Sequence, residues 1–165
     1  MHAYDLAVWS GFFTAVTSAA AALAGLLFVA VSINLESILK DNTMLPSRAA
    51  ETLAMLLFVV ISGALALVPQ SVRLLGAEVL VIVVPLAAII VRDQVRYRRQ
   101  HPDSPLYWSV SRMTASGIAL VPGLVAGISL AAHWGGGLYW LVPTALLGIA
   151  AAVYSAWILL VEIMR

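Results

Sequence analysis

The sequence predicts an all-α membrane protein, a polytopic bundle of five transmembrane helices with its N-terminus outside and its C-terminus inside. Apolar residues make up 62% of the 165 residues and charged residues 10%, against about 45–50% and about 25% in soluble domains. Five apolar runs are each near the length of roughly 20 residues that a helix needs to cross a bilayer. These runs fill most of the chain, so one integral membrane domain over residues 1–165 is expected, with spans near 12–35, 49–68, 72–91, 108–132 and 139–161.

The first run begins without any preceding Lys or Arg, and Asp5 makes this segment mildly acidic. A signal peptide starts with a basic region and ends at a cleavage site with small residues. The run is therefore expected to stay in the protein as a transmembrane helix.

A small-residue stripe follows one face of this first helix at alternating spacings of four and three. In lipid, helices associate where small side chains let their backbones approach closely. We expect the stripe to pack within the subunit, with a subunit interface or a pore lining as alternatives. Its members are Gly11, Ala15, Ser18, Ala22, Gly25, Val29 and Ser32.

The second and third runs are separated by a short turn, in which Ser71 can cap the third helix. Glu78 lies about two turns into that helix, and an ionisable group in a membrane segment is a functional candidate. A structural or interfacial role is the expected alternative, because a carboxylate near a helix N-terminus is favoured by the helix dipole. Pro85 is expected to kink this helix, either as a static bend or as a hinge.

The fourth run carries a glycine row, defined as Ala119, Gly123, Gly127 and Ala131, each four residues apart. Its centre is a GxxxG motif, which predicts a close helix crossing. Pro122 offers a second kink or hinge. The segment Gly135–Gly137 breaks the chain before the fifth run.

Basic residues divide unevenly between the two sides that five spans create. Only Arg73 lies on the side of the N-terminus. Because cytoplasmic loops carry the excess of Lys and Arg, this division predicts the orientation given above. The residues on the other side are Lys40, Arg48, Arg92, Arg96, Arg98, Arg99, Arg112 and Arg165.

Acidic and amide side chains gather at the inner ends of the spans. Glu36, Glu51 and Glu162 lie close in sequence to basic residues and could form a charged ring. Scattered interfacial charge is the alternative, with little energy per pair. Asn34 lies beside Glu36 and could extend a polar path or bond to a neighbouring helix. Together with Glu78 near the outer end of the third span, the candidate intramembrane or interfacial polar residues are Asn34, Glu36 and Glu51.

A basic helical extension follows the third run at residues 92–99. It could bind anionic lipid headgroups, or it could serve only to set the topology. The arginines concerned are Arg92, Arg96, Arg98 and Arg99. Nothing beyond this cluster indicates nucleic-acid binding.

Catalytic and metal-binding patterns are not found in the sequence. There is no cysteine, and the three histidines, His2, His101 and His133, are far apart. No HExxH, P-loop, nucleotide fingerprint or GxSxG occurs. We therefore expect neither an enzyme nor a protein with a cofactor or a metal ion.

Two segments resemble a group of small, largely uncharacterised bacterial multi-pass membrane proteins. These segments are residues 12–36, with Ala24-Gly25-Leu26-Leu27-Phe28-Val29 at the centre, and Leu45-Pro46-Ser47-Arg48-Ala49-Ala50-Glu51. Some members of that group carry the label of modulator of the FtsH protease. The resemblance implies a bacterial inner-membrane location and a regulatory role, and it assigns no site residues.

These observations predict an interaction or regulatory protein that acts through helix–helix contacts in the lipid bilayer. Its partner would be a second copy of the chain or another membrane protein. The alternative is a homo-oligomeric ion channel or small transporter, for which the hydroxyl-bearing stripe, Glu36 below it and Glu78 at the edge of the bilayer would supply the polar groups.

Overall fold

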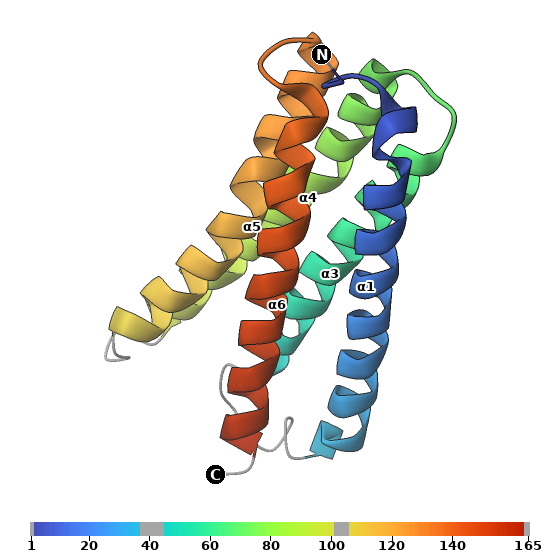
Figure 1. The fold of residues 1–165 in the computed structure, drawn as a ribbon. Helices are drawn as coiled ribbons and strands as arrows, with labels where there is room; N and C mark the ends of the chain where they lie inside the picture. The colour runs from blue at the N-terminus through green and yellow to red at the C-terminus, as the bar shows by residue number, and fades with distance from the viewer. Residues whose placement is uncertain (1, 37–44, 101–105, 164–165) are drawn as a thin grey trace.

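The computed structural model describes residues 2–36, 45–100 and 106–163, with side chains except those of 45, 106–109 and 158–163. These residues form five long helices and one short 3-10 helix (Figure 1). Among the described residues, five helices are long and apolar enough to cross a membrane, and the all-α class is confirmed. The elements are α1 (Leu6–Ile33), α3 (Leu45–Leu67), α4 (Val72–Gln100), α5 (Leu106–Ala132), η1 (Gly137–Trp140) and α6 (Leu141–Ile163).

Helix boundaries differ from the predicted spans where polar residues continue a helix beyond the apolar run. Helix α1 starts at Leu6 rather than at residue 12, because the Asp5 carboxylate accepts a hydrogen bond from the Ala7 backbone N–H over 3.2 Å. Helix α4 runs to Gln100 rather than ending near residue 91, so the basic extension is helical. Ser71 caps α4 as predicted, since its Oγ lies 3.3 Å from the Leu74 amide nitrogen.

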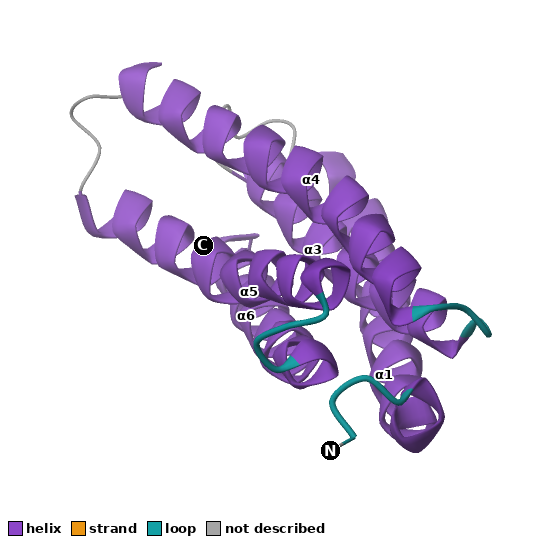
Figure 2. Ribbon diagram, turned by 90° about the horizontal axis from the view of Figure 1, so that it is seen from above, coloured by secondary structure: helices purple, strands orange, loops and turns teal. Residues whose placement is uncertain are grey.

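The helices pack mainly as two antiparallel pairs, α1 with α3 and α4 with α5, and α6 contacts both α3 and α5. The N-terminus and the α3–α4 and α5–α6 turns lie at one end, and the C-terminus lies at the other (Figure 1). We call these the N-terminal end and the C-terminal end. Toward the C-terminal end, the α4–α5 pair leans away from the other helices, and the view from above agrees (Figure 2).

Close helix crossings occur at glycines, as the glycine row predicts. A Cβ added at Gly76 of α4 would collide with the Ala131 backbone of α5, and one at Gly127 would lie 2.7 Å from Leu80 Cγ. On α5, a Cβ at Gly123 would lie 2.9 Å from the Phe58 ring of α3. The row therefore lets α5 approach neighbouring backbones as only small residues allow.

The small-residue stripe lies on the exposed surface of α1 rather than between helices of the described chain. Every member of the stripe is exposed, and no atom of the described residues lies within 4 Å of a Cβ added at Gly11 or Gly25. Within the described residues, the stripe does not pack against another helix as expected, because a different face of α1, which carries Phe13 and Leu27, is buried beside α3. That buried face consists of Phe13, Val16, Ala20, Ala24 and Leu27.

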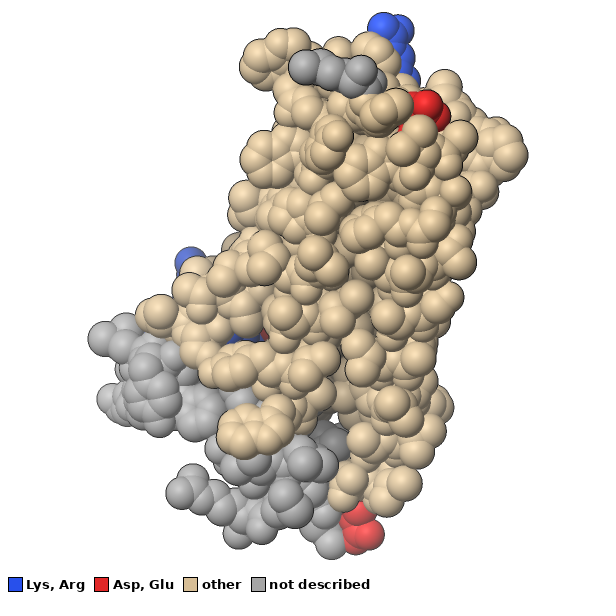
Figure 3. Space-filling view, in the orientation of Figure 1, with Lys and Arg blue, Asp and Glu red and all other residues tan. Residues whose placement is uncertain are grey.

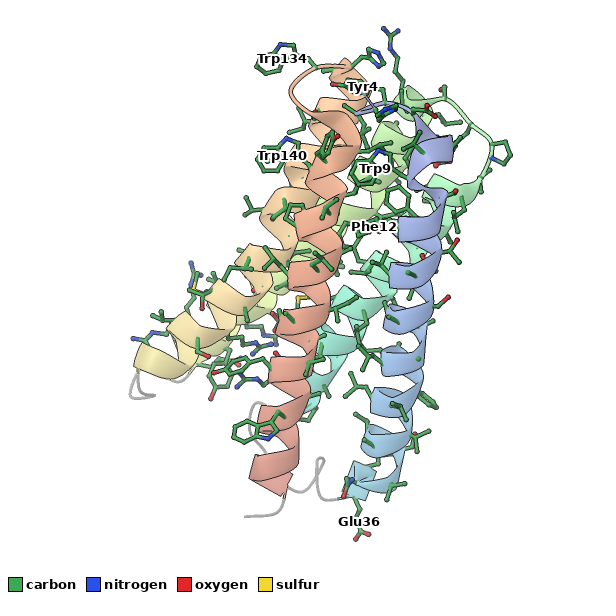
Figure 4. The ribbon with its side chains drawn as sticks, viewed as in Figure 1. Tyr4, Trp9, Phe12, Glu36, Trp134 and Trp140 are labelled. Atoms are coloured by element: carbon green, nitrogen blue, oxygen red, sulfur yellow. The ribbon has the colours of Figure 1, made fainter. Side chains whose placement is uncertain are left out.

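Aromatic side chains close the N-terminal end of the bundle (Figure 4). The Trp9 and Tyr139 rings meet edge to face with centroids 4.8 Å apart, and Tyr4 stacks on His133 at 4.1 Å. The Leu138 amide donates to the Ala3 carbonyl oxygen over 2.8 Å. The segment before α1 is therefore fixed onto the turn that joins α5 to α6.

Candidate functional site

A buried group of polar side chains links three helices; we call it the polar cluster. It comprises Glu51 of α3, Gln94 of α4, and Arg112 and Ser116 of α5. Arg112 Nε donates to Glu51 Oε2 over 2.5 Å, and Gln94 Nε2 donates to Glu51 Oε1 over 2.7 Å. Gln94 Nε2 also lies 2.9 Å from Ser116 Oγ. Both carboxylate oxygens of Glu51 thus have partners, each on a different helix.

The side chains of the polar cluster come from three helices but lie at one level along the bundle. Glu51, Arg112 and Gln94 each stand six residues from the end of their helix at the C-terminal end of the bundle. This places them about 9 Å along the helix axes from those ends, at 1.5 Å per residue. The C-terminal end of the bundle therefore holds a buried ion pair between one and two turns from the ends of these helices.

The electrostatics of the cluster depend on how completely its groups are paired. The exposed fraction of Glu51 is 7% and that of Arg112 is 6%, and taking such charges out of water costs several kcal/mol per ion. Direct pairing and the amide of Gln94 offset this cost, and Ser116 completes its own bonding by donating to the Arg112 carbonyl oxygen over 2.9 Å. The groups of this network are thus hydrogen-bonded to one another. If one member is lost, its buried partners keep the cost of leaving water but lose the bond that offset it.

A small, mostly enclosed cavity lies beside the ion pair, with room for about one water molecule. Three helices line it, and most of its lining side chains are polar and buried. A cavity of this kind can hold water against hydroxyl and guanidinium groups. Its lining residues are Arg48, Glu51, Thr52 and Met55 of α3, Arg112, Ala115 and Ser116 of α5, and Ser155 of α6.

An apolar groove runs between α5 and α6 next to this cavity, and Ala115 contributes to both. Ile118, Ala151 and Tyr154 form much of the groove wall, and Ser111 and Thr114 complete it. The groove is open to the outside of the bundle. The visible face in Figure 3 carries few charged groups, and these lie near the top and in the lower half.

The four predicted polar residues do not form one site. Glu51 belongs to the polar cluster, whereas Glu36 is exposed at the C-terminal end of α1 (Figure 4). Asn34 donates from Nδ2 to the Ala30 carbonyl oxygen of its own helix over 2.8 Å, so it ends α1 instead of reaching another helix. The proposed partners Lys40 and Arg165, and the side chain of Glu162, lie outside the described residues.

Glu78 lies at the opposite end of the bundle, far along α4 from the polar cluster. Its Oε2 accepts a hydrogen bond from Gln70 Nε2 over 2.9 Å, and the same amide donates to the Leu65 carbonyl oxygen. Glu78 therefore helps to hold the α3–α4 turn. This contact accords with the structural alternative for Glu78.

The basic extension lies at the C-terminal end of α4. Arg92, Arg96 and Arg99 are exposed there, and Arg98 is half-buried. Gln94 belongs to the same helical segment, but its side chain faces inward and has an exposed fraction of 8%. One face of this segment thus joins the polar cluster while the arginines lie at the surface.

Arg112, Gln94 and Ser116 are site residues that sequence reasoning missed. Arg112 was counted only as a topological charge, although it stands within the predicted fourth span, where an ionisable residue is a functional signal. Its partner is 61 residues away in sequence. Pairing by proximity in sequence could not find that partner.

Comparison with known proteins gives no match: no family model fits the chain, and no curated protein or solved structure is significantly similar to it. Among the residues that the structure describes, no group of three or more histidine or acidic side chains could hold a metal ion.

Proposed function

We propose that this is a multi-pass membrane protein that acts by contact between α1 and a helix of another membrane protein chain. The single observation that carries this proposal is the open small-residue stripe. Its glycines and small side chains follow one face of α1, and this face has no neighbour in the described chain.

The physical basis is close approach of backbones in lipid. A face that only contacts lipid gains nothing from small residues, because larger apolar side chains serve there equally well. A stripe of Gly, Ala and Ser instead leaves a shallow track along the helix, into which a second helix can settle with dispersion contacts and weak hydrogen bonds. Beside this track the exposed surface of α1 is bulkier, since Phe28 projects from the neighbouring face and Leu26 borders the stripe.

The proposed setting is a bacterial inner membrane with the N-terminal end outside. Among described residues, Arg73 is near the N-terminal end, whereas Arg48, Arg112 and the basic extension lie toward the C-terminal end. This division follows the excess of basic residues in cytoplasmic loops. The resemblance to membrane proteins labelled as modulators of the FtsH protease supports a regulatory rather than an enzymatic role.

The test is to purify the tagged protein from its native membrane in mild detergent and to identify its complexes by native mass spectrometry. We expect a stoichiometric partner or a closed homo-oligomer in the wild type. Gly11→Leu with Gly25→Leu should dissociate that complex, because two bulky side chains then fill the track.

Gly117→Leu is the matched control. Gly117 is also a helical glycine with no atom within 4 Å of an added Cβ, but it lies on α5 away from the stripe. If the doubly substituted α1 kept every complex intact, or if Gly117→Leu dissociated it equally, contact through the stripe would be refuted.

The second candidate function is a homo-oligomeric ion channel or small transporter, favoured by the polar cluster and its cavity. Polar and ionisable groups inside a membrane bundle often mark the path of an ion or a polar solute. Flux through reconstituted vesicles tests it: Glu51→Gln should change the flux, whereas Glu36→Gln should leave it unchanged. Flat flux in the wild type, with and without a membrane potential, would refute this candidate.

A further inference from the structure

The α4–α5 pair has a closely packed half and a polar half. In the first half, toward the N-terminal end, Gly76 and Leu80 of α4 contact Gly127 and its neighbours on α5. In the second half, Gln94 of α4 bonds to Ser116 of α5. The two contacts define the register of these antiparallel helices.

Two prolines lie at the same level between these halves. Pro85 is five residues beyond Leu80 on α4, and Pro122 is five residues before Gly127 on α5, and Leu80 contacts Gly127. Each proline removes one backbone hydrogen bond from its helix and favours a bend there. Both helices of the pair are therefore weakened at one shared level.

Beyond the prolines, the polar half leans away from α1 and from the lower part of α6 (Figures 1 and 2). The Glu51–Arg112 ion pair and the Glu51–Gln94 bond join this half to α3. The cavity lies at the same junction, with Thr52 on the α3 side and Ser155 on the α6 side. Moving the polar half outward would therefore part the cavity walls.

We infer that residues 86–100 and 106–121 form a movable arm, hinged at Pro85 and Pro122 and latched to α3 by the Glu51–Arg112 pair. With the latch closed, the cavity is shut between α3, α5 and α6. With the latch open, the arm swings away from α3 and exposes the cavity lining. The stripe lies on the side of α1 that faces away from α3, and it shares no residue with the arm. The arm therefore works independently of the α1 contact proposed above.

An ion pair suits a latch because its strength depends on exclusion of water. Buried charges attract strongly, but hydrated charges attract weakly. Access of water to Glu51 and Arg112 therefore releases the arm, whereas an apolar contact would be strengthened by water. On the other side of the prolines, the closely packed glycine crossing holds the rest of α4 and α5 in place.

The test uses pairs of spin labels, and the chain has no native cysteine to interfere. Ala50→Cys with Val110→Cys reports on the latched end between α3 and α5, and Leu67→Cys with Ile128→Cys reports on the fixed end. All four positions are exposed. Distances are measured in lipid nanodiscs by continuous-wave and pulsed electron paramagnetic resonance.

We expect Glu51→Gln to produce a longer distance population at the latched end and no change at the fixed end. Adding Pro85→Ala and Pro122→Ala should remove that population, because the helices regain their missing hydrogen bonds. Reversing the charges with Glu51→Arg and Arg112→Glu should restore the short distance. If Glu51→Gln does not fold, the neutral pair Glu51→Gln with Arg112→Gln takes its place.

Three results would overturn the inference. One is an unchanged distance at the latched end when the charges are removed. Another is an equal change at both ends, which means general loosening of the bundle. The third is a long population that persists without the prolines, which places the motion elsewhere.

Discussion

Arg112 of α5 and Glu51 of α3 form a buried ion pair, with 2.5 Å between Nε and Oε2. The pair joins helices that lie far apart in sequence, at the end of the bundle where the helices diverge. Its partners in the polar cluster make the two charges interdependent, so substitutions there should be strongly non-additive.

Removal of either charge alone should destabilise the protein severely. Arg112→Gln leaves the Glu51 carboxylate buried without its cation, and breaking such a pair costs about 3–5 kcal/mol. The neutral pair Glu51→Gln with Arg112→Gln should cost less than Arg112→Gln alone. Reversible unfolding in mixed detergent micelles measures these differences, and equal losses in both variants would contradict the expected interdependence.

Alanine at Gly76 should destabilise the bundle more than alanine at Gly127. The added methyl at Gly76 meets the fixed backbone of α5, whereas the methyl at Gly127 meets the flexible Leu80 side chain. We expect a cost of about 1–3 kcal/mol for overpacking at Gly76. Thermal unfolding in detergent measures it, with Gly117→Ala as the control in open space; equal melting temperatures for all three variants would show that the crossing tolerates a wider separation.

Ser129→Ala should weaken the turn between α5 and α6. The Ser129 hydroxyl donates to the Trp134 carbonyl oxygen and accepts from the Gly137 amide over 2.8 Å, and this amide is buried. Leaving it without a partner costs about 1–3 kcal/mol. Hydrogen exchange at the Gly137 amide should accelerate, while Ser10→Ala, an exposed hydroxyl bonded within its own helix, should leave that exchange unchanged.

The orientation across the membrane can be read with single cysteines. Trp134→Cys, at a side chain that is 81% exposed, should react with a membrane-impermeant maleimide added outside intact cells. Arg99→Cys should react only after the membrane is opened. The opposite pattern would place the N-terminus in the cytoplasm and contradict the expectation from the basic residues.

The basic extension should bind anionic headgroups in proportion to its exposed charge. Replacing Arg92, Arg96 and Arg99 with Gln should reduce the protein's preference for vesicles rich in anionic lipid, since each basic residue near such a surface contributes about 1 kcal/mol. Retention of anionic lipids in native mass spectra measures the effect. If retention is the same in the substituted protein, the arginines act only in topology.

The sequence predicts the spans and one of the two packing faces because these depend on local composition. Run lengths give the five helices, and Gly123 and Gly127 mark a crossing that the structure contains. The face that α1 buries could not be predicted in this way. Small residues permit close approach but do not require it, and the bulk of Phe13 and Leu27 against α3 decides the rotation of the helix.

The polar cluster was only partly predictable for a different reason. Glu51 is conspicuous as an acid in an apolar run, but its partners come from two other helices. The register between those helices arises from packing at Gly76 and Leu80, far from the charges. No spacing of residues along the chain indicates this register.

The hydrogen bond from the Leu138 amide to the Ala3 carbonyl oxygen joins the earliest part of the chain to one of the latest. A ribosome must release the chain as far as residue 138 before this bond can form. Until then α1 holds its place beside α3 without the aromatic closure supplied by Trp9 and Tyr139. The closure thus needs α5 to be in place but not α6, and once formed it ties the start of α1 to the turn that leads into α6.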